Sequence, residues 1–245
     1  MNIIILQHIE CETPGYIKDL MIKDNCNLKT IQLNLGEKIP KNIKQFDAMF
    51  CMGGPMDTWM VKKYPWIIEE KKRIKEFVVE LEKPFLGFCL GCQLLGEVLG
   101  GKVVNSIPSE IGIMDIKMHN NIKDDNLFSS FPYQIKALQW HSYEVKELEN
   151  NKNITLLASS NITKYQIFKY KNHAYGIQFH IEIKDSTVAE WGCVPEYEKA
   201  LIKALGFGAL DKFQREANNN MNKFNNYSQI LYENFKKLCI QKELT

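Results

Sequence analysis

The stretch with the clearest capacity for chemistry is centred on Cys89. An apolar run ends at Phe88 and an apolar helical repeat begins at Leu90, which predicts a buried strand that turns directly into a helix. Gly87 and Gly91 lie two residues on either side of the cysteine, where such a tight turn leaves little room for side chains. The start of the helix favours a thiolate at Cys89, and the thiolate is the form that attacks carbonyl carbon. Because this pattern is only moderately specific, a buried core cysteine between two packing glycines is the alternative.

A second stretch, over residues 175–182, offers the groups that such a nucleophile needs. Apolar and polar residues alternate in it, which predicts a strand with Gln178, His180 and Glu182 on one face. An imidazole can take and return the proton of the Cys89 thiol, while a carboxylate fixes the tautomer and orientation of the ring. For His180 taken alone, a polar strand edge without a catalytic role is the alternative.

A glycine-rich turn follows the apolar run of residues 47–52. Bare backbone at Gly53-Gly54 can direct N–H groups into a pocket. We expect the amides of Gly54 and Leu90 to form an oxyanion hole, which would stabilise the negative charge that develops on an attacked carbonyl oxygen. A turn with no ligand role is the alternative.

A polar and aromatic segment ends another predicted strand and reads Gln139-Trp140-His141-Ser142-Tyr143. We expect this segment to line a substrate or to have a structural role, and a second catalytic base at His141 is the alternative. His8, His119 and His173 have no partner in their sequence context, so we interpret them as surface or packing residues.

The elements that must position these groups follow an alternating order over the first hundred residues. Apolar runs at residues 3–6, 28–33 and 47–52 and before Cys89 predict strands, and helical patterns lie between them. This order predicts an α/β fold with a doubly wound, mostly parallel sheet flanked by helices, whose sites lie beyond the carboxyl ends of the strands. From residue 102 to residue 179, short strands separated by polar loops predict a small antiparallel extension. The strands predicted there cover residues 111–118, 135–140, 154–158, 165–170 and 175–179.

The end of the chain changes in character. Helical patterns run to residue 191 and over 195–205, and an asparagine-rich tract at 218–226 precedes an amphipathic helix. We expect one α/β domain over residues 1–206 and a tail over residues 207–245 that packs on the same domain. A flexible linker at the asparagine-rich tract is the alternative.

Length, composition and charge restrict the class of protein. The 245 residues, 45% of them hydrophobic, can bury the core of one domain with an appendage. The net charge is +2 and the lysines are interspersed with acidic residues, so we expect no nucleic-acid partner. No apolar run approaches the roughly 18–20 residues of a membrane helix, and the opening residues lack a basic leader with a cleavage site. We therefore expect a cytoplasmic protein that does not contact membranes.

The cysteines point away from disulfides and from a metal centre. Seven cysteines are scattered without a framework, which favours reduced thiols. Cys89 and Cys92 form a C-x-x-C pair, but no second such pair and no nearby paired histidines complete a zinc site. We expect no metal and no cofactor.

The two central motifs together resemble the signature of the class I glutamine amidotransferases. That signature is G-x-C-x-G-x-Q, here residues 87–93, followed much later by H-P-E at a strand end, here residues 180–182. Further segments resemble the free-standing branch of this family, which is similar to the amidotransferase domain of GMP synthase and includes γ-glutamyl peptidase-like enzymes. These segments are residues 6–8, 12–15, 52–56, 64–66, 139–141 and 190–191. The resemblance covers about residues 2–192, so residues 1–206 would form a glutamine amidotransferase-like domain.

The resemblance implies roles for individual residues. Cys89 would be the nucleophile, His180 the general base and acid, and Glu182 the partner that orients the ring. The residues implied as the lining of a γ-glutamyl pocket are Gln93, the amides of Gly54 and Leu90, and the segment Trp140, His141, Ser142 and Tyr143.

Two positions depart from the family pattern. Ile181 replaces the usual proline, which is expected to loosen the backbone before Glu182 while leaving both catalytic side chains available. Ser142-Tyr143 stands where the free-standing branch more often has a glycine and an acid, which affects recognition of the amino-acid end of the substrate.

Three functions fit these observations. The favoured one is a free-standing hydrolase that cleaves the γ-amide of glutamine or a γ-glutamyl bond through a glutamyl thioester. The second is an ammonia-supplying subunit of a separate synthetase such as that for GMP. This sequence contains no G-x-x-x-x-G-K-[ST] nucleotide loop, so an ATP-using half would have to be another chain. The third is a catalytically silent binding or scaffold protein of the same fold.

Overall fold

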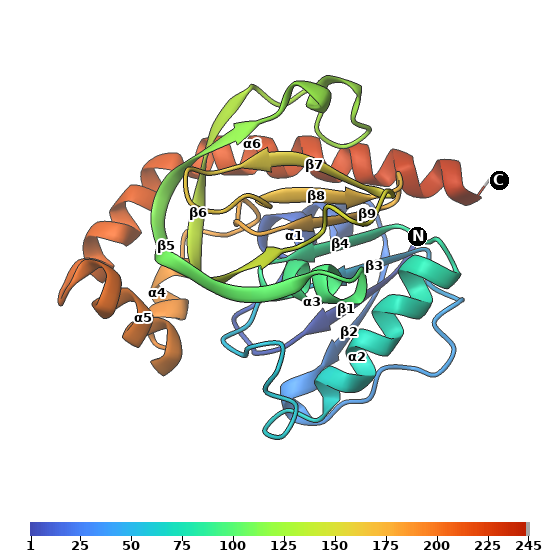
Figure 1. Cartoon of the computed structure of the whole chain (residues 1–245), viewed down its shortest axis with the longest axis horizontal. Helices are drawn as coiled ribbons and strands as arrows, with labels where there is room; N and C mark the ends of the chain where they lie inside the picture. Colours follow the sequence, from blue (N-terminus) through green and yellow to red (C-terminus); the bar gives the residue numbers. More distant parts are fainter. Residues whose placement is uncertain (244–245) are drawn as a thin grey trace.

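The computed structural model describes residues 1–243, and a nine-stranded mixed sheet forms its centre (Figure 1). The strand order is β2-β1-β3-β4-β9-β8-β7-β5-β6. The first five strands in this order are parallel, and the remaining pairings are antiparallel. The strands are β1 (Asn2–Gln7), β2 (Asn27–Gln32), β3 (Ala48–Cys51), β4 (Phe85–Phe88), β5 (Lys102–Met118), β6 (Gln134–Lys146), β7 (Ile154–Ser159), β8 (Ile167–Tyr170) and β9 (Ala174–Ile177). The predicted parallel sheet with an antiparallel extension is confirmed.

Helices cover both faces of this sheet (Figure 1). They are α1 (Gly15–Lys23), α2 (Trp66–Lys75) with a π-helical continuation (Glu76–Glu80), α3 (Leu90–Val98), α4 (Thr187–Gly192), α5 (Pro195–Leu205) and α6 (Ala209–Glu243). Strand β1 explains why two layers are needed: Ile3 and Ile5 pack into the core shared with α1 and α6, whereas Ile4 and Leu6 pack into the core shared with α2 and α3. A strand that is apolar on both faces must be covered on both faces.

The antiparallel extension is larger than the sequence predicts. Strands β5 and β6 pair over most of their length and extend well beyond the predicted ranges 111–118 and 135–140. The register shifts between Asn105 and Glu110, where the segment bulges. The predicted ranges mark only the last part of β5 and the first part of β6, and the parts missed contain exposed polar residues such as Lys102, Asn105 and Lys146.

Strand β9 is shorter than predicted, and this affects the site. Regular pairing ends at Ile177 instead of residue 179. Beyond it, His180 forms an isolated bridge with Leu138 of β6, in which the two backbones exchange hydrogen bonds of 2.8 and 3.1 Å. The chain therefore leaves regular sheet pairing after Ile177, and His180 lies just beyond this point.

The tail is one helix. Helix α6 spans 35 residues and includes the asparagine-rich tract, so the flexible-linker interpretation of that tract is wrong. Its apolar stripe continues through the tract at Met221 and Phe224, which are buried in the same core as the sheet. Four asparagines of the tract are exposed: Asn218, Asn219, Asn222 and Asn226. The division of the chain at residue 206 stays a prediction.

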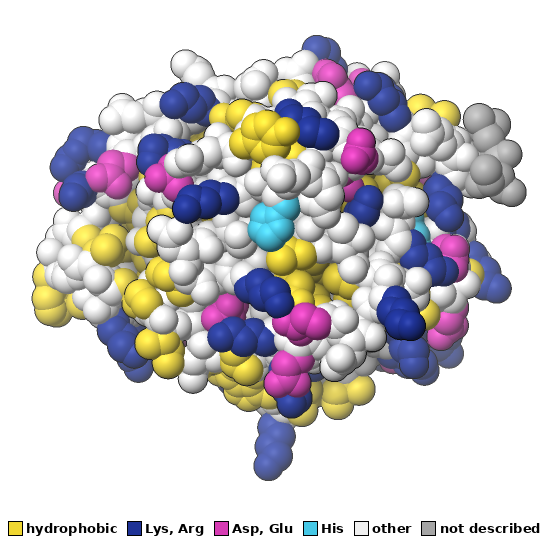
Figure 2. Space-filling model, turned by 45° about the horizontal axis from the view of Figure 1, so that its top comes forward, with side chains coloured by type: hydrophobic (Ala, Val, Ile, Leu, Met, Phe, Trp, Pro, Cys, Tyr) yellow, Lys and Arg dark blue, Asp and Glu magenta, His cyan; other side chains and the backbone are white. Residues whose placement is uncertain are grey.

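The surface carries both signs of charge. Figure 2 shows lysine and arginine side chains interspersed with acidic ones over one face, without a large area of a single sign. No helix within residues 1–243 combines the length and the hydropathy that crossing a bilayer requires.

Candidate active site

Cys89 stands at a strained turn between β4 and α3. Its backbone has φ 47° and ψ −101°, a region that non-glycine residues rarely adopt. The flanking glycines are required by close packing: a Cβ on Gly87 would lie 2.5 Å from the Gly91 carbonyl oxygen, and one on Gly91 would lie 2.1 Å from that of Cys51. The strand-turn-helix geometry predicted around Cys89 is present.

His180 and Glu182 form a buried pair. The Nδ1 atom of His180 lies 2.7 Å from Oε1 of Glu182, and both side chains are 1% exposed. The second carboxylate oxygen accepts a 3.0 Å hydrogen bond from the N–H of Ile181. A proline could not donate this bond, and the expected loosening of the backbone at this position stays a prediction. The Ser228 hydroxyl donates to the Ile181 carbonyl at 2.8 Å and ties the same segment to α6.

The electrostatic environment favours a charged histidine beside the cysteine. Burial alone would lower the pKa of His180, but the Glu182 carboxylate and the hydrogen bonds to Cys89 and Glu182 outweigh it and raise the pKa well above its usual value. A protonated imidazole next to a thiol favours the thiolate. Because Nδ1 faces Glu182, Nε2 is the nitrogen available to exchange a proton with the reacting groups.

Gly54 and Leu90, whose amides are the predicted oxyanion donors, are neighbouring residues in the structure. A Cβ on Gly54 would come within 3.1 Å of the Leu90 side chain. Leu90 is the first residue of α3, so its N–H has no acceptor within its own helix. The neighbouring amides of Cys89 and Gly91 already donate to the carbonyls of Ile177 and Met52. The role of the Gly54 and Leu90 amides as oxyanion donors stays a prediction.

A pocket of about 680 Å³ opens in front of Cys89. Seven predicted site residues line it: Gly54, Cys89, Gln93, Trp140, His141, Ser142 and Tyr143. The amide of Gln93 donates to the Tyr143 carbonyl at 3.0 Å and to the Gln178 side chain at 3.3 Å, which joins α3 to the antiparallel extension. Leu90, His180 and Glu182 do not line this pocket, and all three are buried.

Two of the lining residues are held by structural contacts. The indole of Trp140 donates to the Tyr197 carbonyl at 3.3 Å and packs against Trp191. His141 lies 3.2 Å from the Glu110 carboxylate through Nε2 and 2.9 Å from the Tyr143 carbonyl through Nδ1. The Nε2 atom of His141 has no hydrogen-bond partner among the described residues, so the choice between a lining or structural role and a second base stays a prediction.

The pocket also contains charged residues that the sequence did not single out. Asp57, in the loop after β3, is half-buried, and burial raises its pKa to about 6. Lys199 and Lys203 reach the pocket from α5. Ionic groups of both signs can bind the two charges of an amino acid.

A buried carboxyl group lies behind the histidine. Glu12, in the loop after β1, is 1% exposed and accepts a hydrogen bond from the Tyr197 hydroxyl. Burial raises the pKa of Glu12 and the charge of Glu182 adds to the effect, against the opposing influence of His180 and Tyr197. The position of Glu12 beyond the carboxyl end of a predicted strand was the available signal.

Two histidines interpreted as surface or packing residues are buried and bonded. His173 contacts the Val78 carbonyl at 2.8 Å, which is a packing role. His8 lies 2.8 Å from Glu70 in a fully buried ion pair, so that interpretation is incomplete for His8. His119 is bonded to the Ser159 hydroxyl at 3.1 Å.

Known proteins are similar to this chain in sequence. The sequence pattern described as "Glutamine amidotransferase class-I" matches residues 16–190. The chain belongs to the class I glutamine amidotransferase family. One of the subunits of the glutamine-hydrolysing GMP synthase of Sulfurisphaera tokodaii is 31% identical over 177 residues, which span 69% of this chain and 86% of the relative. The glutamine amidotransferase-like protein YfeJ of Salmonella typhimurium is 28% identical over 173 residues, or 70% of each chain.

Solved structures of this family share the fold. A glutamine amidotransferase from Thermotoga maritima superposes with a TM-score of 0.84 at 26% identity, covering 96% of this chain and 97% of that one. A glutamine amidotransferase from Methylobacillus flagellatus gives the same TM-score at 20% identity, covering 96% and 94%. The shared fold therefore extends beyond residues 16–190.

Proposed function

We propose that this class I glutamine amidotransferase is a cysteine-nucleophile hydrolase that cleaves the γ-amide of glutamine or a γ-glutamyl bond. The observation that carries the proposal is the buried His180–Glu182 pair beside Cys89, at an elbow that opens into a pocket. No residue in this arrangement needs a metal or cofactor for the chemistry described below.

Acylation uses the thiolate of Cys89. Its Sγ attacks the γ-carbonyl carbon and forms a C–S bond, while the carbonyl oxygen becomes an oxyanion within reach of the Gly54 and Leu90 N–H groups. As the C–N bond breaks, the proton on Nε2 of His180 passes to the departing amine. The product is ammonia or the amine remainder of a γ-glutamyl compound, and a glutamyl thioester remains on Cys89.

Hydrolysis reverses the roles of the same groups. Neutral His180 takes a proton from a water molecule, whose oxygen attacks the thioester carbon. The C–S bond breaks, glutamate leaves, and Cys89 returns to its thiolate form beside protonated His180. Glu182 holds the ring in one tautomer through both steps.

Recognition of the amino-acid end of the substrate falls to the charged residues of the pocket. Ser142-Tyr143 offers no acid at the position where the free-standing branch more often has one. Asp57 supplies a carboxylate in the same pocket, and Lys199 and Lys203 supply cations. We assign the α-ammonium group to Asp57 and the α-carboxylate to the two lysines.

The second candidate function is the supply of ammonia to a separate synthetase chain. Its support is the similarity to the GMP synthase subunit of Sulfurisphaera tokodaii, 86% of which is covered by the match. In this function the synthetase chain would receive the ammonia that leaves glutamine. The same triad would act, and only its dependence on the partner would differ.

Steady-state release of glutamate tests the proposal. The purified chain is expected to release glutamate from glutamine or from members of a panel of γ-glutamyl peptides without another protein. Cys89→Ser is the matched inactive control. If the pure chain releases no glutamate from any substrate but hydrolyses glutamine once a synthetase is added, the ammonia-supplying function is correct and the hydrolase function is wrong.

A further inference from the structure

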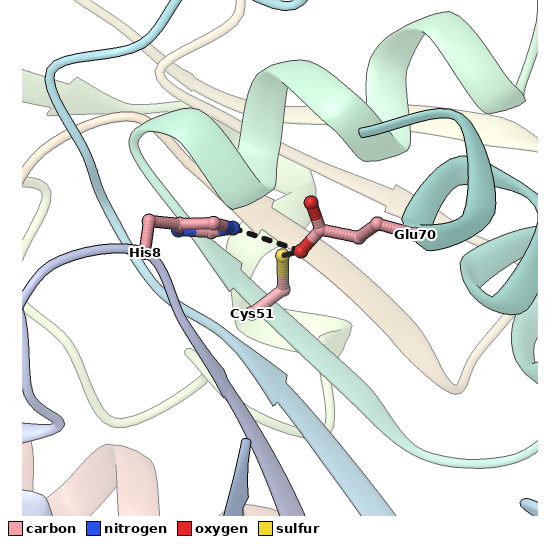
Figure 3. A group of neighbouring side chains, drawn as sticks. All are labelled: His8, Cys51 and Glu70. Atoms are coloured by element: carbon pink, nitrogen blue, oxygen red, sulfur yellow. Dashed lines mark hydrogen bonds and ion pairs between the residues drawn. The ribbon is translucent and has the colours of Figure 1, made fainter. Parts of the chain in front are cut away.

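A second buried ion pair contacts the Gly53-Gly54 turn. His8 follows β1, Glu70 lies on α2, and their side chains meet with Nε2 and Oε1 2.8 Å apart (Figure 3). Both side chains are 0% exposed. The Trp66 ring stacks on the imidazole with a centroid distance of 5.4 Å and an interplanar angle of 22°. The ring of His8 is thus fixed in position and orientation.

The other nitrogen of His8 contacts the backbone of the turn. Its Nδ1 lies 2.8 Å from the carbonyl oxygen of Gly53. A carbonyl oxygen only accepts hydrogen bonds, so Nδ1 of His8 must be the donor to Gly53. Burial opposes the charge, yet Glu70 and these hydrogen bonds outweigh burial and raise the pKa of His8.

The carbonyl that His8 holds belongs to the peptide bond whose N–H is that of Gly54. The peptide unit is planar, so fixing the direction of the oxygen also fixes the direction of the N–H on the opposite side. Two successive glycines leave this peptide unusually free to rotate, because no Cβ restricts it. A hydrogen bond to the carbonyl also polarises the amide and strengthens its N–H as a donor.

We propose that His8, held by Glu70, is a positioning residue that locks the Gly53–Gly54 peptide with its N–H directed to the oxyanion. This inference rests on the proposed hydrolase function. It explains why a buried ion pair occupies positions at which apolar residues would make the free energy of folding more favourable. It also implies that one oxyanion donor is already oriented in the isolated chain.

A metal site is the competing interpretation of the same group. The potential ligand atoms of His8, Cys51 and Glu70 lie within 4.8 Å of one another, the one such group of three found among residues 1–243. The Cys51 thiol donates to Glu70 at 3.3 Å, and burial followed by the charge of Glu70 raises its pKa well above the usual value. A metal ligand must instead be a thiolate. The geometry favours a hydrogen-bonded network in which Cys51 is a donor.

Two amide substitutions separate the two bonds of His8. In His8→Asn the amide nitrogen can take the place of Nδ1 and keep the bond to Gly53, whereas in His8→Gln it can take the place of Nε2 and keep only the bond to Glu70. We expect His8→Gln to lower kcat by about 10- to 100-fold, below the loss for removing an oxyanion donor outright, with KM changed less than threefold. We expect His8→Asn to retain kcat within about fivefold of the wild type.

The rates at which two reagents alkylate Cys89 distinguish a positioning role of His8 from a merely structural one. Iodoacetamide reacts by displacement and forms no oxyanion, whereas a glutamine-mimicking chloroketone passes through one. In His8→Gln the chloroketone rate should fall with kcat while the iodoacetamide rate stays within twofold of the wild type. Peptide mapping separates Cys89 from Cys193, the exposed cysteine.

The outcomes are distinct. Equal losses in His8→Asn and His8→Gln, a parallel loss of iodoacetamide reactivity, or an unchanged kcat in His8→Gln would overturn the positioning role. Stoichiometric zinc in the purified protein would also overturn it, because Nε2 would then be a ligand. A wild-type chain inert to substrates and chloroketone alike would overturn the proposed function, and this inference with it.

Discussion

The molecule contains two fully buried histidine–carboxylate pairs near Cys89, and they differ in what the second ring nitrogen faces. In the His180–Glu182 pair the partners are two residues apart, and the remaining nitrogen is directed to the nucleophile. In the His8–Glu70 pair the partners are 62 residues apart, and the remaining nitrogen holds a backbone carbonyl. The same chemical unit therefore serves proton transfer in one place and backbone orientation in the other.

This comparison predicts losses of different size. His180→Ala should lower kcat by about 10³-fold, because a general acid and base is lost. The expected loss for His8→Gln is at least tenfold smaller than this, because only the direction of an oxyanion donor changes. Glutamate release under saturating substrate measures both. Equal losses would mean that the two pairs are not functionally distinct.

Substitution of Glu182 should likewise lower kcat more than substitution of Glu70. Glu182→Gln is expected to lower kcat by about 10²-fold, since an amide can still contact the ring but stabilises the imidazolium poorly. Glu70→Gln is expected to lower kcat by about three- to tenfold, because a neutral His8 with its proton on Nδ1 still donates to Gly53. The measurement is again kcat, with thermal unfolding as the check on folding. A larger loss for Glu70→Gln than for Glu182→Gln would reverse the assignment.

Substrate recognition should depend on pH through Asp57. Burial raises the pKa of this carboxyl to about 6, so it is charged above that pH and neutral below it. An ammonium group binds only to the charged form, so KM should rise as the pH falls through 6. In Asp57→Asn, KM should be raised about tenfold at pH 7.5, the order expected for a charge-assisted hydrogen bond, and should lose this pH dependence. A variant that keeps the wild-type pH profile of KM would exclude Asp57 from recognition.

Helix α6 should affect stability and leave the chemistry unchanged. Phe224 is 0% exposed, so Phe224→Ala should lower the free energy of unfolding by about 3–5 kcal/mol. Asn219→Ala, at an exposed position of the same helix, is the matched control and should change it by less than about 0.5 kcal/mol. Chemical denaturation measures both values. A large loss of kcat in folded Phe224→Ala would give the helix a role in the site.

The local part of the site could be predicted from the sequence because its signals are local. The turn at Cys89 is predicted by two glycines, Gly87 and Gly91, that flank the cysteine between an apolar run and a helical repeat. His180 and Glu182 are close in sequence, so their proximity in space needs only an extended backbone. The parallel sheet follows from apolar runs that alternate with helical patterns.

The remaining parts depend on contacts between distant segments, which single-sequence patterns do not encode. The pairing of His8 with Glu70 requires α2 to cover β1, and the pairing of Glu12 with Tyr197 joins residues 185 positions apart. The helix through the asparagine-rich tract was missed because its apolar stripe is sparse and local composition favoured a linker. Tertiary packing of Met221 and Phe224 decides the conformation there.

The proposed mechanism depends most directly on a glutamyl thioester at Cys89. The purified chain can be mixed with glutamine, quenched in acid within the first turnovers and mapped by peptide mass spectrometry. We predict a glutamyl adduct on the peptide that carries Cys89, absent in Cys89→Ser, with glutamate released at a matching rate. Glutamate release at the wild-type rate from Cys89→Ser, or an adduct on another cysteine, would contradict this mechanism.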